Sequence, residues 1–185
     1  MDLRKRALEL IDQYIQNQNL KKHLLASENL MRYLARKFGE NEETWALAGL
    51  LHDLDWEITK ETPEKHSLIT VEILEKENFP QEVVLAIKKH NHLQGLTPET
   101  KLEKALYTCE EITGFIVAVA LVMPNKKLSE VTVERILEKF KEPSFAKGVN
   151  REIILKAEEM LNLKLKELSE IALKSMQEIS NDLGL

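Results

Sequence analysis

The stretch LAGLLHDLDWEITKE, residues 47–61, runs from an apolar, helix-like segment directly into a histidine and two aspartates. His52 and Asp53 are adjacent, and Asp55 follows two positions later. Polar groups beside buried leucines need partners, and a histidine–carboxylate cluster without a basic residue often has a metal ion as its partner. Whether a metal explains this stretch depends on where the other histidines of the chain lie.

The apolar residues upstream of this stretch recur at helical spacing. One helix is predicted over residues 3–15, with Asp2 as its N-cap. A second is predicted from about Asn19 to Gly39, because glycine suits a left-handed C-terminal cap. The third, capped by Asn41, is predicted to run from about Glu42 to Asp53 or Leu54. This arrangement places His23 inside the second helix and His52 at the end of the third.

Downstream, prolines and capping residues mark where the helices are expected to begin. The predicted starts are Thr62-Pro63-Glu64, Pro80, Thr97-Pro98-Glu99 and Ser129, with one or two more helices after Asn150. His66 then falls in the first turn or two of its helix, and the helix from Pro80 ends near His90. The helix from Pro98 is expected to be long, because its pattern continues to Met123 before Pro124 stops it.

These patterns predict an all-α protein, a single-domain bundle of about eight or nine helices. No β-type alternation and no internal repeat is found, and 185 residues suffice for one well-buried domain. Residues of about 19–123 would form the core around the histidines, with the helices of 129–185 packing on it. A stripe of apolar residues near the C-terminus fits the core or a dimer interface, so a homodimer stays open: Leu161, Leu163, Leu165, Leu168, Ile171 and Leu173.

Composition and charge exclude several classes of protein. A net charge of −5 argues against nonspecific nucleic-acid binding, which needs a basic stripe. The longest apolar run, 115–123, is about half the length of a membrane span, and the N-terminal residues lack the apolar core of a signal peptide. The single cysteine, Cys109, rules out an intramolecular disulfide and fits a small buried residue better than a nucleophile. We therefore expect a cytoplasmic protein with no nucleic-acid or membrane partner.

The histidines form a pattern on consecutive predicted helices. They lie at positions 23, 52, 66, 90 and 92, and Glu110 lies on the long helix that follows. Each central helix thus offers an imidazole or a carboxylate, as bundle metal sites do. Such donors suit a first-row divalent ion such as iron, manganese, cobalt, nickel or zinc, and several imidazoles with a bridging carboxylate could hold two ions.

This order of residues resembles the HD-domain superfamily of metal-dependent phosphohydrolases, most closely its small prokaryotic members with extra histidines. His23, His52-Asp53 and Glu110 match the outer H…HD…D frame of the family, and His66 and His90 match the added histidines associated with a second metal. The resemblance continues through LEKALYTCEEITGFIVAVALVMPNKKL (102–128) to FKEPSFAKGVNRE (140–152), so it covers most of the chain.

The resemblance implies one or two divalent transition-metal ions held by His23, His52, Asp53, His66, His90 and Glu110. It implies hydrolysis of a small phosphorylated metabolite, a nucleotide or another phosphate ester, by a metal-activated water. Asp53 would be the catalytic carboxylate that bridges the ions or orients the water. The alternative is a module of the same fold that senses a nucleotide or a metal without turnover.

Two departures from the family pattern favour that alternative. The family usually ends its ligand set with Asp in a segment like YAADELTG, whereas this chain reads YTCEEITG with Glu110 at that position. Glu111 should point about 100° away from Glu110. Many members also carry a basic residue just after the HD pair, where this chain has Leu54-Asp55-Trp56. Positive charge for a phosphate would then come from elsewhere: FAKGVNRE offers Lys147 and Arg151, unless this segment is simply a helix start capped by Asn150.

Two further residues are candidate site contacts with open alternatives. His90 and His92 are about 200° apart around a helix, so both can face one site only if the helix ends between them. His90 is then the predicted ligand, and His92 is either a substrate contact or exposed. Asp55 either holds the N–H of a ligand histidine or begins a polar loop.

Overall fold

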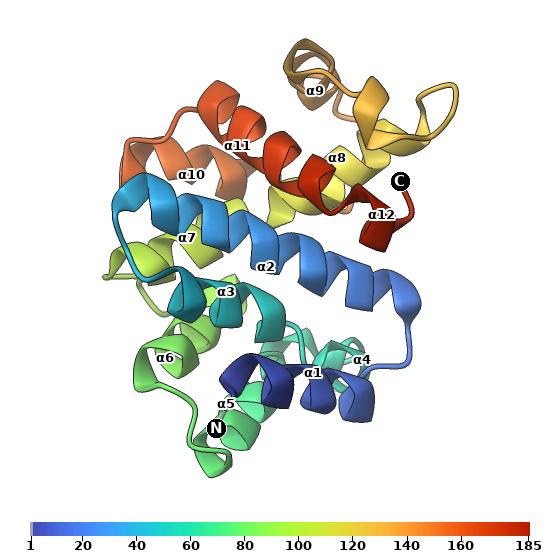
Figure 1. Ribbon diagram of the computed structural model, residues 1–185. Coiled ribbons are helices and arrows are strands. Elements are labelled where there is room, and N and C mark those ends of the chain that lie inside the picture. Colours follow the sequence, from blue (N-terminus) through green and yellow to red (C-terminus); the bar gives the residue numbers. More distant parts are fainter. Residues whose placement is uncertain (1) are drawn as a thin grey trace.

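The longest helix, α2 (Gln18–Phe38), runs through the middle of the molecule, and the other helices pack around it (Figure 1). Figure 1 shows the computed structural model, which describes residues 2–185. Helix α3 (Glu42–Leu51) packs against one side of α2, and α11 (Leu165–Glu178) packs against another. This central position places His23, on α2, between the two halves of the chain.

Every regular element within residues 2–185 is helical, which confirms the predicted all-α class. The other α-helices are α1 (Leu3–Tyr14), α4 (Trp56–Thr59), α5 (Leu68–Lys76), α6 (Gln81–His90), α7 (Lys101–Cys109), α8 (Glu111–Leu121), α9 (Val133–Phe140), α10 (Arg151–Leu161) and α12 (Ser180–Leu183). Three short 3-10 helices join them: η1 (Pro63–Lys65), η2 (His92–Gln94) and η3 (Leu128–Glu130). In this part of the chain no helix is both long and apolar enough to cross a membrane.

The first and third helices begin as their capping residues predict. The side chain of Asp2 accepts a hydrogen bond from the backbone N–H of Lys5, and Asn41 accepts one from that of Thr44. Gly39 ends α2 in the left-handed conformation, with φ of 69°, which glycine adopts without steric cost. Helix α2 begins one residue earlier than predicted, because Asn17 caps it through its side-chain oxygen.

The long helix predicted from Pro98 to Met123 is divided in two. Helix α7 is capped by Thr100 with Glu103 in a capping box, and it ends at Cys109; α8 then begins at Glu111. The backbone N–H and the hydroxyl of Thr113 both contact the carbonyl oxygen of Glu110, at 3.0 and 2.9 Å. A threonine hydroxyl that bonds a nearby carbonyl competes with the regular helical ladder, which the sequence pattern did not indicate. Within residues 2–185, ten α-helices have eight or more residues, and this division adds one to the expected number.

Two other predicted helix starts are wrong. Pro63 opens only the single turn of η1, and α5 begins at Leu68, so His66 lies in the connection between them rather than on a helix. Ser67 follows with φ of 74°, a left-handed conformation that interrupts the helix. Ser129 falls within η3, and Thr132 is the residue that caps α9.

One hydrophobic core joins the whole molecule. It takes buried side chains from every helix of eight or more residues, including α10, which packs on α7, and α11, which packs on α2. The C-terminal apolar stripe belongs to this core: Leu163, Leu168 and Leu173 are buried, and Leu161, Leu165 and Ile171 pack against it. These contacts fix α2, α3 and α7, the helices that frame the histidines.

Helices α2 and α3 approach each other closely at Gly49. A Cβ atom at this position would lie 2.5 Å from the carbonyl oxygen of Ser27 and 2.9 Å from Cγ of Met31. The first of these atoms belongs to the backbone, which cannot rotate away. The absence of a side chain at residue 49 is therefore what allows the two helices to pack at this distance.

We expect Gly49→Ala to destabilise the fold. Alanine has the higher helix propensity by about 1 kcal/mol, but overpacking against a backbone oxygen costs about 1–3 kcal/mol or more, so the loss should prevail. Gly114→Ala is the matched control, because a Cβ there meets nothing within 4 Å and the helix-propensity gain should remain. Urea unfolding of both variants measures the difference, and equal stability of the two would contradict this account of the α2–α3 contact.

Candidate metal centre

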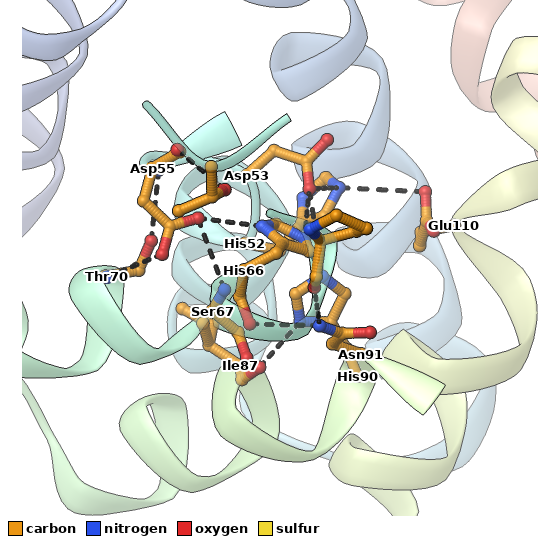
Figure 2. A network of polar contacts seen from close by, with 12 residues as sticks. His52, Asp53, Asp55, His66, Ser67, Thr70, Ile87, His90, Asn91 and Glu110 are labelled. Carbon is orange, nitrogen blue, oxygen red and sulfur yellow. Dashed lines mark hydrogen bonds and ion pairs between the residues drawn. The ribbon is translucent and has the colours of Figure 1, made fainter. Parts of the chain in front are cut away.

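The structure brings the six predicted ligands together where several helices end, and Figure 2 labels all of them except His23. His23 lies in the second turn of α2, His52 and Asp53 follow α3, His66 lies between η1 and α5, His90 is the last residue of α6, and Glu110 lies between α7 and α8. Residues almost ninety positions apart in the sequence thus converge on one place.

Four of these residues form a first donor group. The Nε2 atoms of His23 and His52 are 3.2 Å apart. Oε2 of Glu110 lies 3.4 Å from Nε2 of His23 and 3.6 Å from Nε2 of His52. Asp53 completes the group, with Oδ1 3.4 Å from Nε2 of His52 and Oδ2 3.8 Å from Nε2 of His23. Two imidazoles and two carboxylates therefore face one small volume.

Asp53 also belongs to a second donor group. Its Oδ1 atom lies 3.1 Å from Nε2 of His66 and 3.7 Å from Nε2 of His90. The Nε2 atoms of these two histidines are 3.0 Å apart. The ligand atoms of Asp53, His66 and His90 all lie within 4.8 Å of one another, as do those of His23, His52 and Asp53. A carboxylate shared by two donor groups is suited to bridging two ions.

Each histidine uses its Nδ1 atom for a contact outside the cluster. Nδ1 of His52 lies 2.8 Å from the carbonyl oxygen of Gly49, and Nδ1 of His90 lies 2.6 Å from that of Ile87. His66 uses Oδ1 of Asp55, at 2.7 Å. A carbonyl or carboxylate oxygen only accepts, so these Nδ1 atoms carry the proton.

His23 follows the same rule through a hydroxyl. Its Nδ1 atom lies 3.1 Å from Oγ1 of Thr113. That hydroxyl donates to the carbonyl oxygen of Glu110, so it can accept from His23. With Nδ1–H used in this way, the Nε2 atoms of all four rings converge, and in its neutral form each ring presents a lone pair there. The Nε2 atoms of His66 and His90 are 3.0 Å apart, and those of His23 and His52 are 3.2 Å apart. Two lone pairs at such a distance repel each other unless a cation lies between them. The donor set therefore fits a divalent metal ion.

The charges of the cluster also favour a bound metal ion. Burial alone would raise the pKa of Asp53, but His52, His66 and His90 hold it well below its usual range. Burial alone would lower the pKa of His66, but hydrogen bonds with Asp53 and Asp55 raise it to about 9. The negative potential that draws a proton to His66 would equally attract a metal ion. Burial lowers the pKa of His52, which keeps this ring neutral and able to coordinate.

Asp55 is fully buried behind His66 and holds the loop that carries it (Figure 2). Its Oδ1 atom accepts the backbone N–H of Ser67 in addition to Nδ1–H of His66, and its Oδ2 atom accepts the backbone N–H of Thr70 at 3.0 Å. Of the two alternatives left open by the sequence, the structure favours the one in which Asp55 orients a histidine.

Asn91 is a supporting residue that the sequence did not indicate. Its side-chain amide donates to the carbonyl oxygens of Pro63 and His66, at 2.9 and 3.0 Å. The connection that carries His66 is thereby tied to the end of α6, where His90 lies. Thr113 was missed in the same way; its one signal is a hydroxyl one helical turn after Glu110 within an otherwise apolar segment.

A pocket of about 410 Å³ opens over the cluster. Its polar lining includes five of the predicted ligands, namely His23, Asp53, His66, His90 and Glu110, together with Asn91, His92 and Glu111. Helix α6 ends at His90, so His92 is no longer part of the helix. It lies exposed at the pocket wall rather than in the cluster. The volume falls in the range of pockets that hold small molecules.

Arg151 does not line this pocket, and its guanidinium is engaged elsewhere. It donates to the backbone carbonyls of the preceding segment, including those of Phe140 and Glu142 at 3.1 Å, and lies over the ring of Phe115. Asn150 caps α10 through its side chain, as the alternative for this segment predicted. Lys147 is exposed next to Gly148, which lines the pocket, and a phosphate contact by this lysine stays a prediction.

Glu111 and Cys109, the neighbours of Glu110, have different surroundings from it. Oε2 of Glu111 accepts the backbone N–H of Asn150 at 3.1 Å, and burial and the charge of Glu110 raise the pKa of Glu111 to about 7. Cys109 is buried, and burial raises the pKa of its thiol to about 12. Such a thiol is not a nucleophile at neutral pH, in agreement with the small buried residue expected from the sequence.

Comparison with known proteins identifies the class that this fold and this cluster define. The HD domain family matches residues 20–120, more than half of the chain. The chain therefore belongs to the HD-domain family, part of a superfamily of metal-dependent phosphohydrolases, which confirms the resemblance inferred from the sequence.

Among curated relatives, Ribonuclease Y of Lawsonia intracellularis (strain PHE/MN1-00) is 30% identical over 97 residues, 52% of this chain and 18% of the relative. Ribonuclease Y of Acholeplasma laidlawii (strain PG-8A) is 38% identical over 74 residues, 40% of this chain and 14% of the relative. The chain thus spans less than a fifth of the length of either relative. No solved structure matches it.

Glu110→Gln should lower metal affinity about 10- to 100-fold, the range found when a group supporting a metal site is lost. The amide keeps the size of the side chain but removes the charge that faces Nε2 of His23 and His52. Glu111→Gln, a matched change one residue on, should alter affinity less than about threefold, because its carboxylate contacts Asn150 instead. Calorimetric titration of the metal-free variants with Mn²⁺ compares them, and equal losses would remove Glu110 from the ligand set.

Asp55→Asn should weaken one of two metal-binding steps about 10- to 100-fold and leave the other nearly unchanged. An amide cannot accept at both ends, so one buried N–H among the partners of Asp55 loses its acceptor and His66 loses its fixed orientation. The same titration measures this, with Asp12→Asn, an exposed aspartate paired with Lys21, as control. Two unchanged binding steps would show that Asp55 only stabilises the loop.

Proposed function

We propose that this protein is a metal-dependent phosphohydrolase that acts on a small phosphorylated metabolite, a nucleotide or another phosphate ester. The observation that carries the proposal is the pair of donor groups that share Asp53 and lie open to a pocket of about 410 Å³. Membership of the HD-domain family supports the reaction class. The choice of a small substrate rests on the size of the pocket.

The first donor group would hold one divalent ion and the second another, with Asp53 between them. Imidazole and carboxylate donors suit iron, manganese, cobalt, nickel or zinc. Bound there, such an ion would act as a Lewis acid toward a phosphoryl oxygen and lower the pKa of a coordinated water.

The side chains of this protein would then position the reactants. The pKa of Asp53 is held far below neutrality, so its carboxylate is ionised and can accept a hydrogen bond from the attacking water without taking its proton. In the hydrolysis the water oxygen forms a bond to phosphorus, the ester P–O bond breaks, and the proton that the water loses is balanced by the one that the departing oxygen gains. His92, which lines the pocket wall, would be the side chain that meets the departing group.

A small ester is a better proposal than RNA, although the two relatives are named as ribonucleases. The chain carries a net charge of −5, and no lysine or arginine is among the pocket-lining residues in the part of the chain that the structure describes. A polynucleotide needs cationic contacts along several phosphates. The alternative of a sensing module without turnover rests on Glu110 and on the absence of a basic residue after Asp53.

Asp53→Ala should abolish phosphate release, with a loss of at least about 100-fold, and should lower metal content, because both donor groups lose a ligand. The test uses protein purified without a histidine tag, elemental analysis, and an aryl phosphate with the metal found. Far-UV circular dichroism confirms that the variant is folded, and Asp12→Ala provides a surface control. Undiminished release by a folded Asp53→Ala variant would contradict the mechanism. Metal binding by the native protein without release from any ester would favour the sensing module.

A further inference from the structure

Part of the wall of the pocket above the metal centre is apolar. It is formed by residues from six elements: Leu20 on α2, Trp56 on α4, Pro63 on η1, Leu93 on η2, Tyr107 on α7 and Ile153 on α10. Trp56 is 38% exposed and Leu93 is 52% exposed. Large apolar side chains left open to water beside a polar cluster are typical of a pocket that binds a partly apolar ligand.

Trp56 is held next to the second donor group. Its indole ring makes an edge-to-face contact with the imidazole of His66, with centroids 5.0 Å apart and planes at 80°. It follows Asp55, which is fully buried, so the backbone at this point is fixed by the contacts of that carboxylate. A flat aromatic surface therefore lies at a set distance from the place where a phosphate ester would react.

The charges around the pocket limit how many phosphates a ligand can carry. The lining contains the carboxylates of Asp53, Glu110 and Glu111 and, in the described chain, neither lysine nor arginine. The guanidinium of Arg151 is bound to backbone carbonyls. One phosphoryl group could be neutralised by metal ions at the cluster, but a second or third would lie beside carboxylates, with no lysine or arginine among the lining residues of the described chain to pair with it.

We propose that the pocket selects nucleoside monophosphates, with Trp56 as the surface on which the base stacks. This inference rests on the proposed phosphohydrolase activity and specifies its substrate. A nucleoside monophosphate combines one phosphoryl group with a flat, partly apolar base. Stacking on an aromatic side chain depends little on which base is bound. The pocket should therefore distinguish nucleotides from non-aromatic esters, but it should not distinguish one base from another.

Binding can be tested separately from turnover, because the chain has only two tryptophans. Trp45 is 3% exposed and lies in the core, so a ligand in the pocket should quench only the fluorescence of Trp56. Titration of the metal-loaded protein with adenosine monophosphate should give saturable quenching, and ribose phosphate should give little. In Trp56→Phe the quenching should vanish. Saturable quenching that persists in Trp56→Phe, or none in the native protein, would overturn the inference even if esters are hydrolysed.

Turnover gives an independent test of the same residue. Trp56→Ala should raise KM for adenosine monophosphate about 10- to 100-fold, while hydrolysis of ribose phosphate changes less than about threefold. Trp56→Phe keeps a ring and should retain most of the affinity. Ile58→Ala replaces a more exposed apolar residue of α4 that does not line the pocket, and it should change KM for neither substrate. Equal effects of Trp56→Ala on both substrates, or a preference for adenosine triphosphate, would overturn the assignment. If no ester is hydrolysed, the proposed function fails and the quenching titration still decides whether a nucleotide binds at Trp56.

Discussion

The contact between Gly49 and the backbone of Ser27 sets the distance between α2 and α3, and the metal centre depends on it. His23 lies one helical turn before Ser27, and His52 lies three residues after Gly49. The two ligands are therefore each about one turn from the point where the helices touch, and their Nε2 atoms end 3.2 Å apart. Gly49 contributes a second time, because its carbonyl oxygen accepts the Nδ1–H of His52. One residue thus fixes both the separation of the helices and the orientation of a ligand.

The ends of helices orient the histidines. The carbonyl groups of the last turn of a helix have no intrahelical partner. His52 and His90 both come at a helix C-terminus, and each donates Nδ1–H to the carbonyl three residues before it, Gly49 in one case and Ile87 in the other. A free backbone acceptor is satisfied in this way while Nε2 is left facing the cluster. His66, which has no helix end beside it, depends on the buried carboxylate of Asp55 for the same purpose.

The sequence predicted the helical class, most caps and the set of residues that converge, because these depend on local spacing and residue chemistry. It did not predict features that arise from contacts distant in sequence. The break at Glu110 reflects the Thr113 hydroxyl, which contacts both the Glu110 carbonyl and His23, a residue 90 positions away. The left-handed Ser67 follows from the backbone contacts of Asp55. Arg151 was a candidate phosphate contact, but its guanidinium donates to the backbone carbonyls of Phe140 and Glu142. The sequence pattern did not predict the conformation of that segment.

The same donors that make the cluster suitable for metal ions make it costly without them. Asp53, Glu110 and four histidines are wholly or partly withdrawn from water in a space a few ångströms across, and the desolvation of each must be offset by a partner. A ligand that binds only the folded chain stabilises it by RT ln(1 + [L]/Kd), about 4 kcal/mol at a thousand times Kd, which is a large share of the stability of a domain this size. The metal ions would therefore be part of the folded structure as well as of the chemistry. Because the pocket lining offers no lysine or arginine within residues 2–185, those ions would also supply most of the positive charge that a phosphate meets there.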